Sequence, residues 1–285
     1  MRNKEKPRII NSELITRFTN ALREQEKSVA TIQKYIRDLT ALSAHLSNTP
    51  VTKMALIGWK EHLTAKYAPA SVNTMLAAMN SLLNFCGWLD LKVKPLKIQK
   101  SMFCDEGKEL TRSEYIRLIH AANKKGNERL ALVLQAICAT GIRVSELKFI
   151  SAEAVLLGKA EISNKGKRRT VFLPKKLCQM LNKYMQRQKR TAGTVFVTKT
   201  KKPLDRSNIW RDMKSLCESA GVSPEKVFPH NLRHLFAKTY YSIEKDLSRL
   251  ADILGHSNVN TTRIYTVESG TVHAKQLEGM NLVTT

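Results

Sequence analysis

Apolar residues recur every three to four positions along the first third of the chain, with polar residues between them. This period is typical of helices that bury one face. Two such stripes comprise Leu14, Phe18 and Leu22, and then Ile32, Ile36, Leu39, Leu42 and Leu46. Further helices are expected over 52–67 and from about Ser71. The pattern predicts a compact four-helix unit in residues 1–91.

A lysine-rich segment that contains Pro95 follows, and we interpret residues 92–108 as a basic linker. Thr111 and Glu114 then form a capping-box pattern, which is typical of the first turn of a helix. This pattern indicates the start of a second domain, which we expect to span residues 109–285.

The second domain combines helical patterns with one β-pattern. Helices are expected at 114–123, 128–139, 176–188, 206–220, 231–243 and 246–254. Two short runs at 160–163 and 170–173 flank a polar turn at 164–169, which indicates a β-hairpin. The predicted fold class is therefore mainly α with a small antiparallel β-sheet.

Composition and cysteine usage narrow the class of protein. A hydrophobic fraction of 42% is ordinary for a globular chain, and no apolar run approaches the roughly 18 residues of a membrane span. The N-terminus lacks the apolar core of a signal peptide, so we expect a cytoplasmic protein. The five cysteines form no CxxC pair, which argues against a disulfide framework and against a metal site.

Net charge is the strongest global signal. The chain carries 48 lysines and arginines against 24 acids, a formal charge of +24. Both halves are basic, so the charge is not confined to one tail. A polyanion such as nucleic acid is the expected partner. An acidic membrane surface is the weaker alternative, since no basic amphipathic helix with a bulky apolar face stands out.

Two basic residues near the C-terminal end of the sequence have a spacing suited to anion binding. His230 and Arg233 lie three residues apart at a predicted helix start after Pro229, which places both on one face. The free N–H groups of a helix N-terminus add affinity for an anion. An upstream arginine, Arg143, follows the end of another predicted helix. Each signal alone is weak, and their combination is more informative.

The combination resembles the tyrosine recombinases, also called the phage integrase family, which includes Xer-type and Cre-type enzymes. The motifs that carry the resemblance are Thr140-Gly-Ile-Arg143-Val-Ser-Glu146-Leu147, Lys165-Gly166, His230-Asn-Leu-Arg233-His234, Leu254-Gly-His256 and Tyr265. They occur in the order of the family, and His256 precedes Tyr265 by the usual interval. The resemblance covers residues 109–270 closely and the first four helices loosely.

The resemblance implies a covalent mechanism on DNA. Tyr265 would attack a scissile phosphate, giving a 3′-phosphotyrosyl link and a free 5′-hydroxyl. Arg143 and Arg233 would hold the charge that builds on the phosphate oxygens, because a planar guanidinium can bind two oxygens. The resemblance implies no metal ion, cofactor or ATP, since the phosphotyrosine keeps the bond energy for religation.

The remaining motif residues would assist this step. His230 and His256 would donate hydrogen bonds, and His230 could also take up the tyrosine proton. Lys165 would protonate the leaving 5′-oxygen. Glu146, three residues after Arg143, would orient that arginine.

Several assignments have rivals in the sequence. Tyr240 and Tyr241 are alternative nucleophiles, although their place within a predicted helix favours a core role. Lys167 competes with Lys165, because both lie in the predicted hairpin turn. His234 is expected to pack structurally rather than to act in catalysis.

Basic residues outside the motifs are candidates for contacts to the DNA backbone. The hairpin supplies Lys167, Arg168 and Arg169, and the linker supplies Lys94 and Lys97. The sequence does not single out residues that read bases.

The resemblance also implies the architecture and the assembly. An N-terminal helical core-binding domain of the SAM-like type and a catalytic domain would clamp double-stranded DNA at a specific recombination site. Four protomers, as two dimers, would exchange strands through a Holliday junction, and residues 266–285 would dock on a neighbouring protomer. The four-helix unit begins near residue 11, so we expect a simple Xer-like or Cre-like recombinase without an arm-binding domain.

The biological role remains open at this point, as integration, excision or resolution of a DNA element, with or without a second recombinase or an accessory factor. Two alternatives from other classes are a type IB topoisomerase-like relaxing enzyme and a DNA-binding architectural protein with an idle site.

Overall fold

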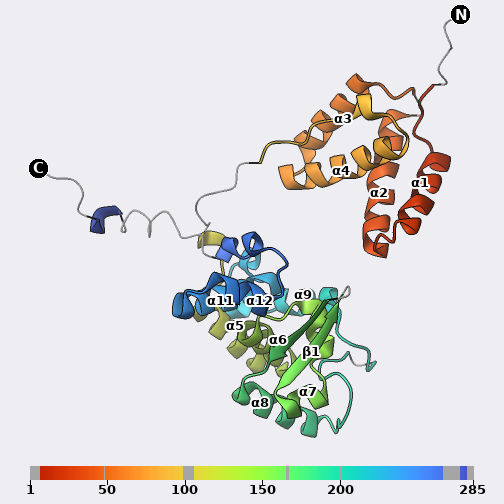
Figure 1. The fold of residues 1–285 in the computed structure, drawn as a ribbon. Coiled ribbons are helices and arrows are strands. Elements are labelled where there is room, and N and C mark those ends of the chain that lie inside the picture. Colours follow the sequence, from red (N-terminus) through yellow and green to blue (C-terminus); the bar gives the residue numbers. More distant parts are fainter. Residues whose placement is uncertain are drawn as a thin grey trace, which may run out of the picture. The chain divides into compact units, whose positions relative to one another are not determined.

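The computed structural model describes residues 7–47, 49–98, 106–164, 167–198, 200–265 and 277–280. The chain divides into two compact units, Met1–Lys100 and Ser101–Thr285, and each is described by itself (Figure 1). Lys165 and most of the predicted docking tail, residues 266–276 and 281–285, lie outside the described residues. No helix in the described ranges is long and apolar enough to span a membrane.

The described part of the first unit is helical, as the sequence predicted (red to orange in Figure 1). It contains α1 (Ser12–Glu24), α2 (Val29–Leu46), α3 (Lys53–Lys66), α4 (Pro69–Phe85) and the short 3-10 helix η1 (Leu89–Leu91). The side chains of Asn11, Ser28 and Thr52 cap the first three helices. Helix α4 begins at Pro69, earlier than predicted, because proline suits the first helical position.

The first half of the predicted linker packs against the first unit. The Asn80 side chain accepts a hydrogen bond from Val93 N at 3.0 Å and donates one to Val93 O at 2.8 Å. Asn73 binds the backbone of Leu96 in the same two-way manner. Val93 is buried in the core of this unit. The backbone at Val93 and Leu96 is therefore fixed along α4, while residues 99–105 lie outside the described part of the chain.

We expect Asn80→Ala to lower the free energy of unfolding by about 1–3 kcal/mol, because it leaves two backbone groups of Val93 without their partner. The matched control is Asn84→Ala on the same helix, whose amide only accepts a hydrogen bond from exposed Lys92. That change should cost less than about 0.5 kcal/mol. Urea unfolding of the full chain measures both. Equal costs would show that Asn80 does not hold the segment.

The second unit is mainly helical with one hairpin, as predicted. Its elements are η2 (Glu106–Lys108), α5 (Arg112–Lys124), α6 (Glu128–Thr140), η3 (Val144–Phe149), α7 (Ala152–Leu157), β1 (Lys159–Asn164), β2 (Lys167–Phe172), α8 (Lys175–Arg187), α9 (Arg206–Lys214), α10 (Cys217–Ala220), η4 (Pro224–Lys226), α11 (Pro229–Glu244), α12 (Leu247–Leu254), η5 (Val259–Thr261) and η6 (Arg263–Tyr265). The capping box at Thr111 and Glu114 is confirmed. The single helix expected over 206–220 is two helices, since the chain leaves α9 at Ser215 and starts α10 at Cys217.

Helix α6 crosses the core of this unit and packs against α11. It ends at Gly141, whose φ of +63° is a left-handed conformation that favours glycine. A Cβ atom there would lie 2.5 Å from the Phe236 ring of α11, so the close approach also requires glycine. This turn brings Arg143 next to the start of α11.

The hairpin differs from the prediction in the extent of its second strand. Strands β1 and β2 pair antiparallel with Asn164 opposite Lys167, so residues 167–169 belong to β2 and the turn predicted over 164–169 is wrong. Side chains on a strand alternate between faces. Arg169 therefore shares the inner face with buried Val171, whereas Arg168 is exposed.

Candidate active site

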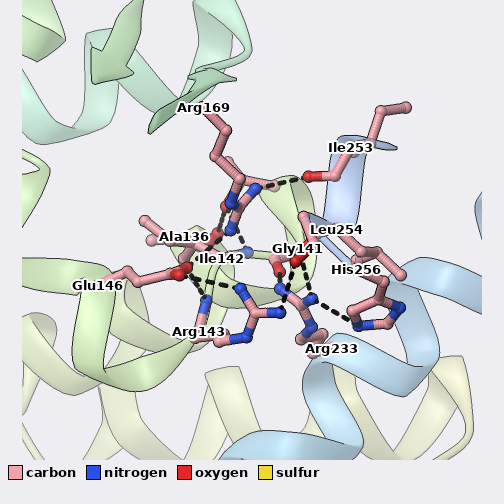
Figure 2. Close-up of polar contacts among 12 residues, drawn as sticks. Ala136, Gly141, Ile142, Arg143, Glu146, Arg169, Arg233, Ile253, Leu254 and His256 are labelled. Atoms are coloured by element: carbon pink, nitrogen blue, oxygen red, sulfur yellow. Dashed lines mark hydrogen bonds and ion pairs between the residues drawn. The ribbon is translucent and has the colours of Figure 1, made fainter. Parts of the chain in front are cut away.

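The N-terminal turn of α11 carries Arg233, which is 3% exposed. Its guanidinium donates to the backbone oxygens of Gly141 and Leu254, and Nη2 lies 3.1 Å from His256 Nε2 (Figure 2). Burial, together with the charge of Arg143, lowers the pKa of Arg233 to about 10. The side chain thus keeps its positive charge at neutral pH inside the protein.

Glu146 forms the other fixed point of the site and is 1% exposed. Its carboxylate accepts from Arg143 N at 2.9 Å, from Arg143 Nη1 at 3.0 Å and from Arg169 Nη2 at 2.7 Å. Burial alone would raise the pKa of Glu146, but the hydrogen bond from Arg143 N and the charge of Arg169 outweigh it and lower the pKa. The carboxylate stays ionised and holds both arginines.

Three successive backbone oxygens at the end of α12 each accept from a different arginine. Arg169 binds Ile253 O and Arg233 binds Leu254 O, each at 2.5 Å (Figure 2). Arg143 binds Gly255 O at 3.1 Å. The carbonyl groups at a helix C-terminus carry partial negative charge and lack partners within the helix. The guanidinium groups supply those partners and anchor the turn that presents His256.

The protonation of His256 follows from its two hydrogen-bond partners. A guanidinium has no acceptor, so the contact with Arg233 makes Nε2 of His256 the acceptor. Nδ1 then carries the proton and donates to Thr262 Oγ1 at 2.9 Å. Thr262 is fully buried, and no sequence signal pointed to it. Nε2 is thus held by Arg233 as an acceptor rather than being available as a donor.

Tyr265 lies beside these residues and is 3% exposed. It packs in a small cluster with Ala237, Leu250 and Leu254. Its ring meets the His234 ring edge-on at 4.6 Å between centroids. The rival tyrosines Tyr240 and Tyr241 are partly buried against the same cluster.

One cavity of about 460 Å³ collects four of the six predicted catalytic residues, which are Arg143, His230, Arg233 and His256. Arg206 and Trp210 of α9 also line it, and the sequence reading did not identify them. Tyr265 is not part of the lining. Lys165 and the side chain of Lys167 lie outside the described part of the chain.

The predicted DNA contacts fall in different settings. Lys94, Lys97 and Arg168 are exposed. Arg169, which we expected to face DNA, instead engages Glu146 and Ile253 inside the unit. Lys94, Lys97 and Arg168 can therefore contact a partner from the surface, whereas the guanidinium of Arg169 binds groups within the protein.

Two imidazoles of the site should stay neutral far below their usual range. Burial and Arg233 lower the pKa of His256 to about 4, and burial and His230 lower that of His234 to about 4. We expect two of the seven histidine ring signals in NMR spectra to titrate near pH 4. His256→Gln and His234→Gln assign them by loss of one signal each. Titration of both near 6.5 would contradict the prediction.

The same shifts predict a loss of stability in acid. Because each folded-state pKa lies below the unfolded value, the unfolded chain binds more protons between about pH 6.5 and 4. The stabilising contribution is complete above 6.5 and is lost as the pH falls through this window. Urea unfolding at several pH values should therefore show a decline that becomes shallower in His256→Gln.

Comparison with known proteins identifies the family. Residues 108–270 match the phage integrase family, and residues 15–88 match the phage integrase N-terminal SAM-like domain. The chain belongs to the phage integrase family. Within this family it is 30% identical over 273 residues to tyrosine recombinase XerA of Pyrococcus horikoshii, covering 92% of both chains. It is 29% identical over 301 residues to XerD of Xanthomonas campestris, covering 93% of this chain and 92% of that protein.

Solved structures of family members share the fold. XerH bound to its difH substrate matches with a TM-score of 0.70 at 20% identity, over 94% of this chain and 84% of that one. A lambda integrase dimer bound to a COC′ core site matches with a TM-score of 0.75 at 17% identity, over 91% and 96% of the two chains.

Proposed function

We propose that this protein is a site-specific DNA recombinase that cleaves and rejoins DNA through a 3′-phosphotyrosine intermediate and a Holliday junction. The observation that carries the proposal is the convergence of Arg143, His230, Arg233 and His256 in one cavity, with Tyr265 beside it. Three sequence segments supply these four residues. Their chemistry, two guanidinium groups and two imidazoles, suits a phosphate that gains negative charge during attack.

The two arginines bind the scissile phosphate and stabilise its transition state. Their contacts to backbone oxygens and to Glu146 fix the guanidinium planes before DNA arrives. Groups held in place in this way need little reorganisation when charge develops. Arg143 has a side chain that is 37% exposed, and it presents its charge at the cavity surface.

The histidines and the hairpin lysine move protons or donate hydrogen bonds. His230 is exposed at the cavity and can accept the proton of the attacking tyrosine. His256 donates to a phosphate oxygen once DNA displaces Arg233 from Nε2 and the ring proton is carried on Nε2 instead of Nδ1, with Nδ1 then accepting from the Thr262 hydroxyl. Lys165 protonates the 5′-oxygen that leaves. The cleaved strand then carries the protein at its 3′ end.

Tyr265 must leave its buried position to attack. Its ring packs against His234 and the apolar residues of α12 and stacks beside His256, and its side chain hydrogen-bonds to Arg233, but it does not line the cavity. We infer that DNA binding moves the short segment η6 so that the hydroxyl reaches the phosphate.

Partners and assembly follow from the relatives. Structural neighbours include lambda integrase as a dimer on a core site and as a tetramer on a Holliday junction. We infer that this chain acts on double-stranded DNA with a specific site, as two dimers that form a tetramer. Residues 266–285 join neighbouring protomers, and a second recombinase or an accessory factor is compatible with this scheme. The substrate implies action in the cytoplasm at the nucleoid.

The polarity of a trapped adduct tests the function. Wild-type protein is mixed with a pool of nicked duplexes of varied sequence, on which the released fragment diffuses away. We expect a denaturation-resistant adduct on the strand with a labelled 5′ end, and a released fragment whose 5′-hydroxyl a polynucleotide kinase can label. An adduct at a 5′ end, or none despite tight binding, would refute the proposal.

A plasmid that carries two copies of the selected site separates recombination from relaxation. Recombinant products are expected. Relaxation without them would favour a topoisomerase-like enzyme.

A further inference from the structure

Arg169 connects three elements of the catalytic unit. Its side chain is 14% exposed. Nη2 donates to Glu146 on η3 and Nη1 donates to Ile253 O at the end of α12, while the residue itself belongs to β2 (Figure 2). Both ends of the guanidinium are therefore engaged inside the protein. Its partners, rather than DNA, must explain its role.

Each of these contacts leads directly to a residue of the cavity. Glu146 holds Arg143 through both its backbone N and its guanidinium. Ile253 begins the turn that ends at His256, and the next two carbonyl groups of that turn hold Arg233 and Arg143. We propose that Arg169 is a positioning residue for DNA cleavage, which fixes Glu146 and the last turn of α12 and through them orients Arg143 and His256. The inference rests on the proposed function.

Packing leaves Arg169 little freedom. Gly255 has a φ of +64°, and a Cβ atom there would lie 2.5 Å from Arg169 Cδ. The Arg169 side chain therefore occupies the space that a side chain at position 255 would need. The guanidinium is locked between the carboxylate and the helix end, and its position in turn constrains both.

The energetics do not favour a role in stability alone. Arg169 Nε is buried and has no hydrogen-bond partner, which costs free energy. Burial and the nearby charge of Arg143 lower the pKa of Arg169 although Glu146 opposes the shift, so removing this guanidinium from water carries a cost. Buried ion pairs often add little net stability. The contribution of this one lies in the orientation of the groups that it holds.

Removing the guanidinium should impair the chemical step. Without Arg169, Glu146 keeps only Arg143 as a cationic partner, and Ile253 O loses its donor. A displacement of about 1 Å in a catalytic group can slow a reaction by about 10²-fold. We expect a loss of this size in cleavage rate, with DNA affinity close to that of the wild type.

The test compares Arg169→Gln with Arg129→Gln on the nicked duplex selected by the trapping experiment. Arg129 is a matched control, because it also bridges a backbone oxygen, Val197 O, and a carboxylate, Asp212, but does not line the active-site cavity. Single-turnover cleavage at saturating protein gives the rate, and titration gives the affinity. Arg169→Gln should be slower by about 10²-fold, and Arg129→Gln within about threefold of the wild type.

A neutral scissile group distinguishes positioning from a general structural effect. In a duplex with a methylphosphonate at the cleavage site, the transition state carries less negative charge, so it depends less on well-oriented arginines. The ratio of wild-type to Arg169→Gln rates should fall from about 10² to within about threefold. A merely misfolded fraction would lower both rates by the same factor.

The conservative variant keeps the test decisive if Arg169→Gln does not fold. Arg169→Lys retains a charge opposite Glu146 but lacks the planar fork that spans both acceptors, so it should show an intermediate loss. An Arg169→Lys rate equal to the wild type, or an equal defect on both substrates, would overturn the inference alone. No adduct from wild-type protein would instead overturn the proposed function, and the inference with it.

Discussion

Replacing Tyr265 with phenylalanine is expected to abolish the covalent protein–DNA adduct and to leave DNA binding intact. The phenol oxygen is the atom that would join the phosphate, so its removal leaves no bond to form. The expected loss in cleavage rate is about 10⁴-fold or more. The ring itself remains to fill its place against His234 and the apolar cluster, so the fold should persist.

Denaturing gels count the adducts, and affinity titration with thermal unfolding checks binding and folding. The matched controls are Tyr240→Phe and Tyr241→Phe, which remove hydroxyl groups near the same cluster. Both should form adducts at nearly the wild-type level. An adduct that persists in Tyr265→Phe and vanishes in one of the controls would move the nucleophile to α11.

Helix ends were predictable because their signals are local. Thr111 and Glu114 form the capping box that the spacing indicated. Gly255 ends α12 in a left-handed conformation, as expected from glycine after an apolar helical pattern. Such features depend on residues within one or two turns, so one sequence is enough to read them.

The roles of Arg169 and Thr262 could not be predicted, for two different reasons. Arg169 meets Ile253 across 84 residues. We assigned it to a turn, where side chains have no fixed face, but it lies on a strand whose alternation points it inward. Thr262 binds His256 at close range, yet a threonine in a short 3-10 region has no distinctive pattern.

The linker shows the same limit. Its lysines and Pro95 indicated an extended basic chain, and the amides of Asn73 and Asn80 that bind its backbone lie on α4. An asparagine on a helix face gives no sign of whether it meets water or a neighbouring chain. The composition predicted a basic, extended segment, but only the structure shows that its backbone packs against α4.

The contacts of Arg233 explain why this one arginine should have a large effect on the cleavage rate. Arg233 donates to Gly141 O, which ends α6, to Leu254 O, which ends α12, and lies against His256 Nε2. It therefore joins the three segments that supply Arg143, His230 with Arg233 itself, and His256 to the cavity. A planar guanidinium can do this because its donors point in several fixed directions.

Arg233→Lys is accordingly expected to slow cleavage by about 10²–10³-fold at saturating protein, with little change in DNA affinity. An ammonium group keeps the charge but cannot reach all three acceptors with the geometry of the fork, so buried carbonyl oxygens lose partners. The free energy of unfolding should fall by about 1–3 kcal/mol.

Single-turnover cleavage, affinity titration and urea unfolding measure the three effects of Arg233→Lys. Arg129→Lys, outside the cavity, controls for the loss of a bridging guanidinium. If Arg233→Lys cleaved at the wild-type rate, charge alone would suffice, and the fixed fork would have no part in stabilising the transition state.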